Sequence, residues 1–365
     1  MNAKAKHGPR KYIKVGRSYP WRPNLVRLQA PWQKGRLVLC LGAGVSIPYG
    51  LPNWEDLLLS LLLRLPPSTD TRGSDDTDGW HQYFPHYRRA LGQWMMEYFK
   101  FDPVELARVF VDDEKLRSNI RAELYAPLAK LGPAVPRRTS LDAVVALIAD
   151  AKRAANPVPA VITLNYDDLL ETKLEAAGVQ STPVFGPNAK VVGIPIYHVH
   201  GYLPRAGEIP KQDLVFTEST YHQISSSGFH WSVKTIMRHL HTHSVLFVGV
   251  SMNDPNLRRF LDMAYTEGED PRHFATREDY SVEEEALDGA MEQIEKRAKK
   301  AAKEMGRDET KTPPQLRAAV KDVCEKAHEY DKQTLRSLGV RPIWVRDNSD
   351  IPSILDLIRT RIPDA

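Results

Sequence analysis

The fold of this chain is decided at Arg36–Ser46, which reads RLVLCLGAGVS. Within it, Leu37–Leu41 is a short, continuous apolar run, the pattern of a strand buried on both faces of a parallel sheet. The glycines that follow permit a tight turn, in which backbone N–H groups can converge on a phosphate without Cβ atoms in the way. We therefore expect the first parallel strand to end in a glycine-rich turn.

The same succession of a buried strand and a helix recurs along the chain. After the run that ends at Val250, a helix is expected to begin at Asp254-Pro255, a side-chain cap followed by a first-turn proline. Recurring strand–helix units predict an α/β fold with a doubly wound, Rossmann-like parallel sheet. The further runs that we assign to strands are Ala160–Leu164, Ile194–His200, Ser244–Val250 and Val340–Val345.

The chain of 365 residues is long enough for one large domain. We divide it into a basic N-terminal arm, residues 1–35, and an α/β domain, residues 36–365. Two segments interrupt the strand–helix pattern. Residues 66–155 are mostly helical in pattern and are expected as an inserted helical subdomain, whereas residues 282–327 form a charged, helix-favouring segment.

Charge is distributed unevenly along the chain. Residues 1–54 contain ten Lys or Arg and no Asp or Glu, so the remainder carries 40 basic against 46 acidic residues. The arm is either a contact for nucleic acid or an acidic partner surface, or else a solvated tail or oligomer contact. No apolar run is long enough for a membrane span and the start lacks the apolar core of a signal peptide, so we expect a cytoplasmic protein without membrane contact.

Several classes of chemistry are disfavoured by composition and spacing. Cys40 and Cys324 are the only cysteines, which excludes a disulfide framework and a four-cysteine zinc site. The histidines at 239, 241 and 243 have no neighbouring Cys or acidic residue, so we expect no metal. Gly50 comes too late for the dehydrogenase fingerprint, and no strand-ending acid follows at the required spacing, which disfavours hydride transfer.

Polar residues follow three of the predicted strands. Thr163–Asp167 reads TLNYD, Tyr197–Gly201 reads YHVHG and Gly249–Asp254 reads GVSMND. Because the carboxyl ends of parallel strands share the edge at which open α/β sheets bind ligands, we expect these segments to face one crevice together with the glycine turn. Taken singly, their polar residues also have structural explanations as turn residues or helix caps.

In this order the four segments resemble the signatures of sirtuin-like domains: Gly-Ala-Gly-x-Ser, Thr-x-Asn-x-Asp, His-Gly and Gly-x-Ser. The resemblance extends from about Leu39 to Leu261. The four-cysteine zinc module of the deacetylases in this family is absent, and Pro52–Glu55 replaces the family's Pro-x-Phe-Arg segment without its Arg. In Asn165–Glu171 and Ser251–Arg259 the chain is similar instead to the prokaryotic sirtuin-like NADases of anti-phage defence, which deplete cellular NAD.

The resemblance implies an NAD hydrolase that cleaves the nicotinamide–ribose bond and releases nicotinamide and ADP-ribose, with NAD as substrate and no metal. Asn165 would bind the nicotinamide ribose and position water, Asp167 would orient the amide or ribose end, and His200 would be the general base. The remaining NAD-binding residues would be Gly42, Ala43, Gly44, Val45 and Ser46 at the pyrophosphate, and Gly249 and Ser251 at the adenosine half.

Three alternatives stay open at this point. His198 shares a strand face with His200, so either could react, although Gly201 favours His200. The chain could be an NAD-dependent protein deacylase or ADP-ribosyltransferase, which use the same first half of the chemistry, or a non-catalytic sensor of NAD or ADP-ribose. As partners, the resemblance implies a homo-oligomer larger than a dimer and a second protein such as a HerA-type ATPase.

Overall fold

The computed structural model describes residues 21–62, 94, 96, 98, 103–110, 113–128, 138–153, 157–228, 230–279, 284–304, 314–346 and 348–359. The first 20 residues of the predicted arm and much of the predicted helical insertion lie outside these described residues. No helix within the described ranges is long and apolar enough to cross a lipid bilayer.

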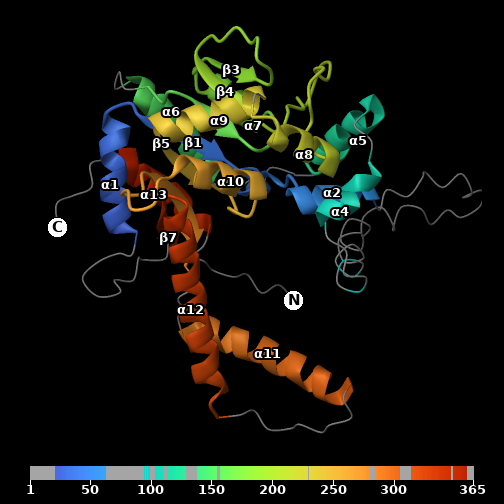
Figure 1. Ribbon diagram of the computed structural model, residues 1–365, viewed down its shortest axis with the longest axis vertical. Helices are drawn as coiled ribbons and strands as arrows, with labels where there is room; N and C mark the ends of the chain where they lie inside the picture. Colours follow the sequence, from blue (N-terminus) through green and yellow to red (C-terminus); the bar gives the residue numbers. More distant parts are fainter. Residues whose placement is uncertain are drawn as a thin grey trace, which may run out of the picture.

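A seven-stranded sheet forms the centre of the molecule, and all of its strands pair in parallel (Figure 1). Apolar cores lie on both faces of this sheet, so the predicted doubly wound, Rossmann-like fold is confirmed. The order across the sheet is β3-β4-β2-β1-β5-β6-β7. The strands are β1 (Leu37–Leu41), β2 (Val161–Thr163), β3 (Ser181–Val184), β4 (Ile194–His198), β5 (Ser244–Val248), β6 (His273–Glu278) and β7 (Val340–Val345).

Strand β1 lies in the middle of the sheet and is buried along its whole length, as its continuous apolar sequence predicts. Leu37, Leu39 and Leu41 enter the core on one face, while Val38 and Cys40 enter the core on the other. The strand order reverses here, because the chain leaves β1 toward β2 and β4 and later returns to β5 on the other side. Open α/β sheets bind ligands at such a switch point, at the carboxyl ends of the strands.

Two of the seven strands, β3 and β6, contain no continuous apolar run and escape the sequence analysis. Strand β3 is an edge strand that contains Pro183 and buries only Val184. Strand β6 buries His273, whose Nδ1 accepts the backbone N–H of Val245 at 3.2 Å. Strand β4 ends at His198, two residues before the predicted end, so that His200 lies in the following turn.

Helices cover both faces of the sheet. The first core contains residues of α1, α5, α6, α7 and α13, and the second contains residues of α9 and α10. The helices are α1 (Arg22–Gln33), α2 (Trp54–Leu62), α4 (Pro103–Leu106), α5 (Glu114–Tyr125), α6 (Ser140–Arg153), α7 (Leu169–Ala176), α8 (Glu218–Ser226), α9 (Trp231–Thr242), α10 (Pro255–Ala264), α11 (Glu284–Glu304), α12 (Leu316–Ser337) and α13 (Ile351–Arg359).

Helix α1 comes from the part of the chain that the sequence analysis assigned to the N-terminal arm. Leu25 and Leu28 are fully buried in the first core, and the side-chain amide of Asn24 donates to the carbonyl of Pro342 in β7 at 2.7 Å. Residues 22–33 therefore pack as part of the α/β domain. With only two deeply buried side chains and a proline near each end, α1 gives a weak amphipathic signal in the sequence.

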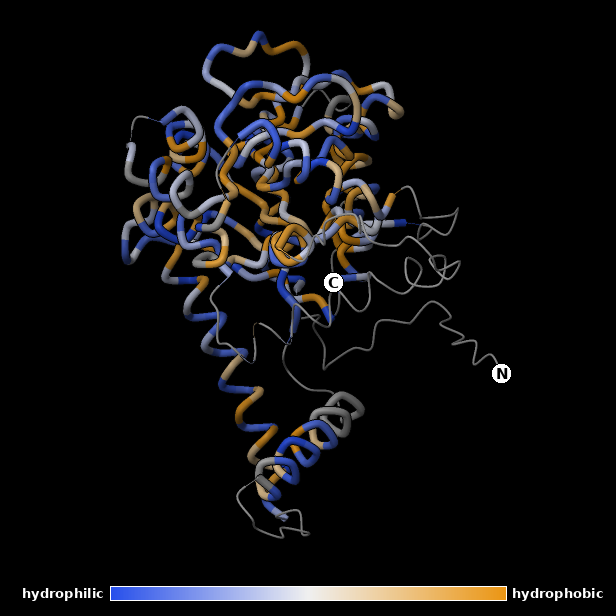
Figure 2. Tube along the Cα trace, turned by 90° about the vertical axis from the view of Figure 1, so that its right-hand side faces the viewer, coloured by the Kyte–Doolittle hydropathy of each residue, from blue (hydrophilic) through white to orange (hydrophobic). Residues whose placement is uncertain are grey.

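Helices α11 and α12 extend away from the sheet as a pair (Figure 1, Figure 2). The C-terminal part of α12 packs on the domain, where Leu335 is buried in the second core beside Val340 of β7. Farther from the sheet, Val323 and Tyr330 of α12 are exposed. The predicted charged segment, residues 282–327, coincides with α11 and the first half of α12.

Candidate functional site

Two glycine turns meet at the carboxyl edge of the sheet, by which we mean the edge at which β1, β2, β4 and β5 end. Gly42 donates its N–H to the carbonyl of Val248 at 3.1 Å, and Gly44 donates to the carbonyl of Gly249 at 2.9 Å. A Cβ atom on Gly44 would lie 2.7 Å from the Cα atom of Gly249, closer than real Cβ contacts allow. The glycines of the two turns are therefore required for contact between the turns themselves.

Backbone N–H groups of the first turn form hydrogen bonds within the turn itself. Val45 donates its N–H to the carbonyl of Gly42 at 3.2 Å, and Ser46 donates to the carbonyl of Ala43 at 2.9 Å. The N–H of Gly44 is used by the second turn. The predicted phosphate-binding segment thus has the expected compact shape, but in this conformation its glycines are explained by packing of backbone on backbone rather than by an approaching phosphate.

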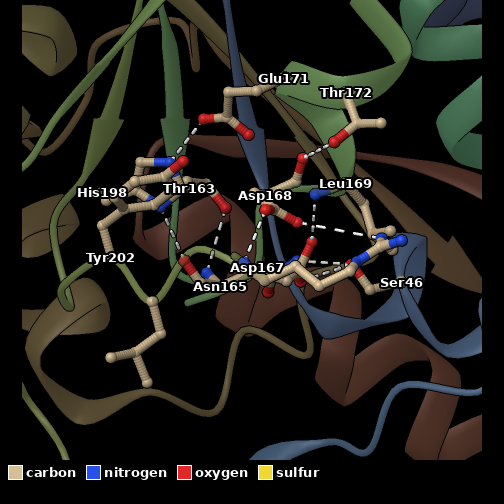
Figure 3. A network of polar contacts seen from close by, with 12 residues as sticks. Ser46, Thr163, Asn165, Asp167, Asp168, Leu169, Glu171, Thr172, His198 and Tyr202 are labelled. Carbon is tan, nitrogen blue, oxygen red and sulfur yellow. Dashed lines mark hydrogen bonds and ion pairs between the residues drawn. The ribbon is translucent and has the colours of Figure 1, made fainter. Parts of the chain in front are cut away.

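Asn165 is held against the glycine turn by two hydrogen bonds, one of which goes to Ser46 (Figure 3). Its Nδ2 atom donates to the carbonyl of Gly42 and to Oγ of Ser46, both at 3.1 Å. The carbonyl of Gly42 can only accept, which fixes the amide orientation with Nδ2 on this side. The opposite atom, Asn165 Oδ1, makes no hydrogen bond to a described residue.

Asp167 holds Ser46, the hydroxyl partner of Asn165, by a hydrogen bond. Ser46 Oγ donates to Oδ2 of Asp167 at 2.9 Å, and the N–H of Leu169, at the start of α7, donates to Oδ1 at 3.1 Å. Burial raises the pKa of Asp167 to about 6, although the hydrogen bonds from Ser46 and Leu169 act in the opposite direction. Asp167 is buried, and its side-chain contacts lie within the protein.

His198 is enclosed beneath Asn165. Its side chain has an exposed fraction of 0%, with Nε2 2.6 Å from Oε1 of Glu171 and Nδ1 3.1 Å from the backbone carbonyl of Asn165. The ring of Tyr202 packs against the imidazole with 4.5 Å between centroids. Nδ1 is occupied by the backbone carbonyl and Nε2 by the carboxylate, so neither ring nitrogen is open to a ligand.

His200 has a different environment. Its side chain is 19% exposed, and Nε2 lies 3.5 Å from Oδ2 of Asp254. Burial lowers the pKa of His200, while Asp254 and the carbonyl of Leu164 act in the opposite direction. Burial therefore favours the neutral imidazole, the form that can accept a proton.

Asp254 caps helix α10, as its position before Pro255 predicts. Its Oδ1 accepts the N–H groups of Asn256 and Leu257 at 2.8 and 3.0 Å. This capping role of Asp254 follows from the sequence, whereas its second contact, with His200, does not. The sequence does place Asp254 at the end of the segment GVSMND, directly after a strand. A residue in that position can cap the next helix and also lie at the edge where such sheets bind ligands.

Ser251 lies in the turn between β5 and α10 and is exposed. Its Oγ accepts the N–H of Asn253 at 3.3 Å, and its carbonyl accepts a hydrogen bond from Arg277 Nη1 at 2.7 Å. No sequence motif pointed to Arg277, which comes from the end of β6. The structure thus places the predicted residues of all four segments at one edge, although Ser46 and Asp167 contact the protein's own polar groups there.

Within the ranges that the structure describes, no group of three or more His, Cys, Asp or Glu side chains is arranged to hold a metal ion. The arrangement can supply a neutral imidazole, an amide oxygen and two closely packed backbone turns. Such groups can bind a polar ligand and accept a proton from it.

Comparisons with known proteins agree with this geometry. Residues 159–306 match a family described as a SIR2-like domain, which confirms the resemblance to sirtuin-like domains over that range. The chain is also 24% identical, over 273 residues, to a protein of Acinetobacter baumannii (strain 532279) named NAD(+) hydrolase ThsA. That alignment covers 71% of this chain and 47% of the relative, so the chain spans about half the length of the curated relative it matches.

Proposed function

We propose that this protein binds NAD at the carboxyl edge of the sheet and hydrolyses the nicotinamide–ribose bond. The observation that carries the proposal is that two side chains lie at the same edge of the sheet. Asn165 has an Oδ1 atom without a hydrogen bond to a described residue, and His200 is partly exposed, lies beside Asp254 and has a pKa that burial lowers. The similarity to a SIR2-like domain and to a protein named NAD(+) hydrolase supports NAD as the substrate.

In the proposed complex, the pyrophosphate of NAD lies against the turn Gly42–Ser46, and the adenosine half lies at Gly249 and Ser251. The two turns already pack on each other through Gly44 and Gly249, so their backbones can approach a shared ligand closely. This placement leaves the nicotinamide ribose over β2 and β4, where Asn165 and His200 follow their strands.

The chemical step breaks the bond between C1′ of the ribose and N1 of nicotinamide. Nicotinamide leaves with the bonding electron pair, and positive charge develops on the ribose ring as in other glycosyl transfers. A water molecule then forms the new bond to C1′, and His200 accepts the proton that this water releases. Asn165 Oδ1 accepts a hydrogen bond from the ribose or the water and orients it. The products are nicotinamide, ADP-ribose and a proton.

Ser46, Asp167, His198 and Glu171 act in this proposal as the support of Asn165. Ser46 and Asp167 fix the amide, while His198 and Glu171 hold the backbone carbonyl of the same residue. A side chain fixed from both ends loses little conformational freedom when the transition state forms. Asp167, assigned to the nicotinamide end by the sequence, acts here through Ser46.

Two other functions share the first half of this chemistry or its binding step. A protein deacylase or ADP-ribosyltransferase would pass the ribose to an acceptor other than water, and a sensor would bind NAD without cleaving it. Purified full-length protein incubated with NAD separates all three, because hydrolysis yields equal amounts of nicotinamide and free ADP-ribose. Nicotinamide without free ADP-ribose would favour transfer, and unchanged NAD with measurable binding would favour the sensor.

The same experiment with Asn165→Ala tests the site. We expect turnover to fall at least about a hundredfold, the lower end of what a positioned catalytic group supplies. The melting temperature should change little, because Asn165 is only partly buried. Near-normal turnover in a folded Asn165→Ala protein would remove Asn165 from the proposed mechanism.

We further propose that the protein depletes NAD in the cytoplasm during anti-phage defence, as a homo-oligomer larger than a dimer, with a HerA-type ATPase or nucleic acid as candidate partners. The basic arm is the proposed contact. Light scattering should compare the full chain with a chain lacking residues 1–20, because a longer deletion would remove buried residues of α1. A monomer in both cases, with equal NAD cleavage, would contradict assembly through the arm.

A further inference from the structure

The turn that carries Ser251 has an unusual backbone. Gly249 has φ +65°, and Met252, a residue with a side chain, has φ +61°. A left-handed conformation at a non-glycine residue costs free energy, so contacts elsewhere must hold the turn in place. Met252 is buried in the second core, which anchors one side of the turn. Ser251 itself is exposed and needs a separate anchor.

Arg277 provides that anchor from the end of β6. Its Nη1 atom donates to the carbonyl of Ser251 at 2.7 Å. The rest of the guanidinium is paired with Asp331 of helix α12, through Nε to Oδ2 at 3.0 Å and Nη2 to Oδ1 at 3.1 Å. Such a two-point pair fixes the plane of the guanidinium, and hence the direction of the third hydrogen bond.

Both members of the pair are largely shielded from water, with side chains that are 14% and 18% exposed. On the same side of α12, His328 Nδ1 lies 3.0 Å from Oδ1 of Asp279, which follows β6, without forming a hydrogen bond. The ring of His328 also packs on Trp344 of β7, with 4.1 Å between centroids. The base of the α11–α12 pair is therefore fastened beside the carboxyl ends of β6 and β7.

We propose that Arg277 is a positioning residue that connects helix α12 to the Ser251 turn, so that the affinity for the adenosine half of NAD depends on the Arg277–Asp331 pair. This inference rests on the proposed function, because it takes the Ser251 turn to be the adenosine contact. It gives the projecting pair α11–α12 a physical connection to the site: a displacement of α12 moves Asp331, the guanidinium and the carbonyl of Ser251 together.

The test substitutes Asp331 rather than a residue of the site. Asp331→Asn keeps the size of the side chain but loses the charge and one acceptor of the two-point pair. We expect KM for NAD to rise about tenfold, the effect of losing one charge-assisted hydrogen bond, while kcat changes less than about twofold. Arg277→Lys keeps the charge but loses the planar guanidinium that forms the two-point pair, so it should raise KM for NAD in the same way.

Asp322→Asn is the matched control. Asp322 lies on the same helix and forms an exposed ion pair with Lys326 at 2.7 Å, without contact to the turn. This variant should keep the wild-type KM. A role of Asp331 in folding alone would lower the melting temperature and leave KM unchanged at temperatures where the protein is folded, and that result would overturn the inference.

Calorimetric binding of ADP-ribose supplies a readout that does not depend on cleavage. Weaker ADP-ribose binding by Asp331→Asn than by Asp322→Asn would support the connection even if the wild-type protein failed to hydrolyse NAD, which would defeat the proposed hydrolase function alone. Equal ADP-ribose affinities in both variants and the wild type, with NAD cleavage intact, would overturn the inference alone. Absence of ADP-ribose binding by the wild type, together with absence of NAD cleavage, would overturn both.

Discussion

Nε2 of His200 lies 3.5 Å from Oδ2 of Asp254, whose other oxygen is held by the first two N–H groups of helix α10. The two atoms are too far apart for a short, strong hydrogen bond. Because α10 fixes the carboxylate, the negative charge stands at a constant place beside the imidazole. Burial and Asp254 act on the pKa of His200 in opposite directions, and burial has the larger effect.

Replacing each histidine in turn distinguishes the base from its neighbour. His200→Ala should lower kcat for NAD cleavage at least about a hundredfold with little change in melting temperature, because His200 is partly exposed. His198→Ala should instead lower the melting temperature, since it leaves the largely buried Glu171 without its partner. Loss of activity at an unchanged melting temperature in His198→Ala, with an active His200→Ala, would reverse the assignment.

Removing the charge of Asp254 should shift the pH dependence of the reaction. Asp254 raises the pKa of His200 against the effect of burial, so Asp254→Asn should lower that pKa further. The acid limb of kcat/KM against pH then moves to lower pH, because the neutral base persists in more acidic solution. Asn caps helices as well as Asp does, so stability should be preserved.

Asp262→Asn, an exposed position on the same helix, is the matched control for this pH experiment. Its profile should coincide with that of the wild type. An unmoved acid limb in Asp254→Asn would mean that a group other than His200 controls the reaction on the acid side.

The buried carboxyl group of Asp167 should make stability depend on pH. Its pKa is raised from 3.8 to about 6, so between these values the folded protein binds more protons than the unfolded chain. The free energy of unfolding of the wild type should therefore fall as the pH rises through this window. Relative to Asp167→Asn, which cannot titrate, the loss between pH 4 and pH 7 should be about 1–3 kcal/mol. Urea unfolding at both pH values measures it, and equal pH dependence of the two proteins would contradict the raised pKa.

Packing between the glycine turns predicts the effect of adding one methyl group. In Gly44→Ala the new Cβ would lie 2.7 Å from Gly249 Cα, so both turns must move and stability should fall by about 1–3 kcal/mol. Gly186→Ala, where nothing lies within 4 Å of the added Cβ, should be nearly neutral. Denaturant unfolding of the two variants gives the comparison. If Gly44→Ala weakened NAD binding at unchanged stability, the glycine would serve the phosphate rather than the fold.

Local sequence patterns were enough to predict most strands of the parallel sheet. The apolar runs located β1, β2, β4, β5 and β7, because strands that pack between two apolar cores are rich in apolar residues. Local patterns also located the cap at Asp254, since capping involves atoms only two and three residues apart. Strands β3 and β6 escaped because their burial depends on neighbours in the sheet rather than on their own composition.

The motifs placed the candidate site at one edge of the sheet, but only the tertiary structure decided what each residue contacts there. The period of a strand put His198 and His200 on one face, whereas the strand ends between them and encloses one while leaving the other accessible. The glycines predicted a phosphate turn, yet their closest neighbours belong to a second turn about 200 residues away in the chain. The contact of Arg277 with Ser251 and Asp331 joins three separate elements and has no sequence signature. Periodicity and spacing report the local burial and capping of a residue, while contacts between distant segments are fixed only when the sheet order brings those segments together.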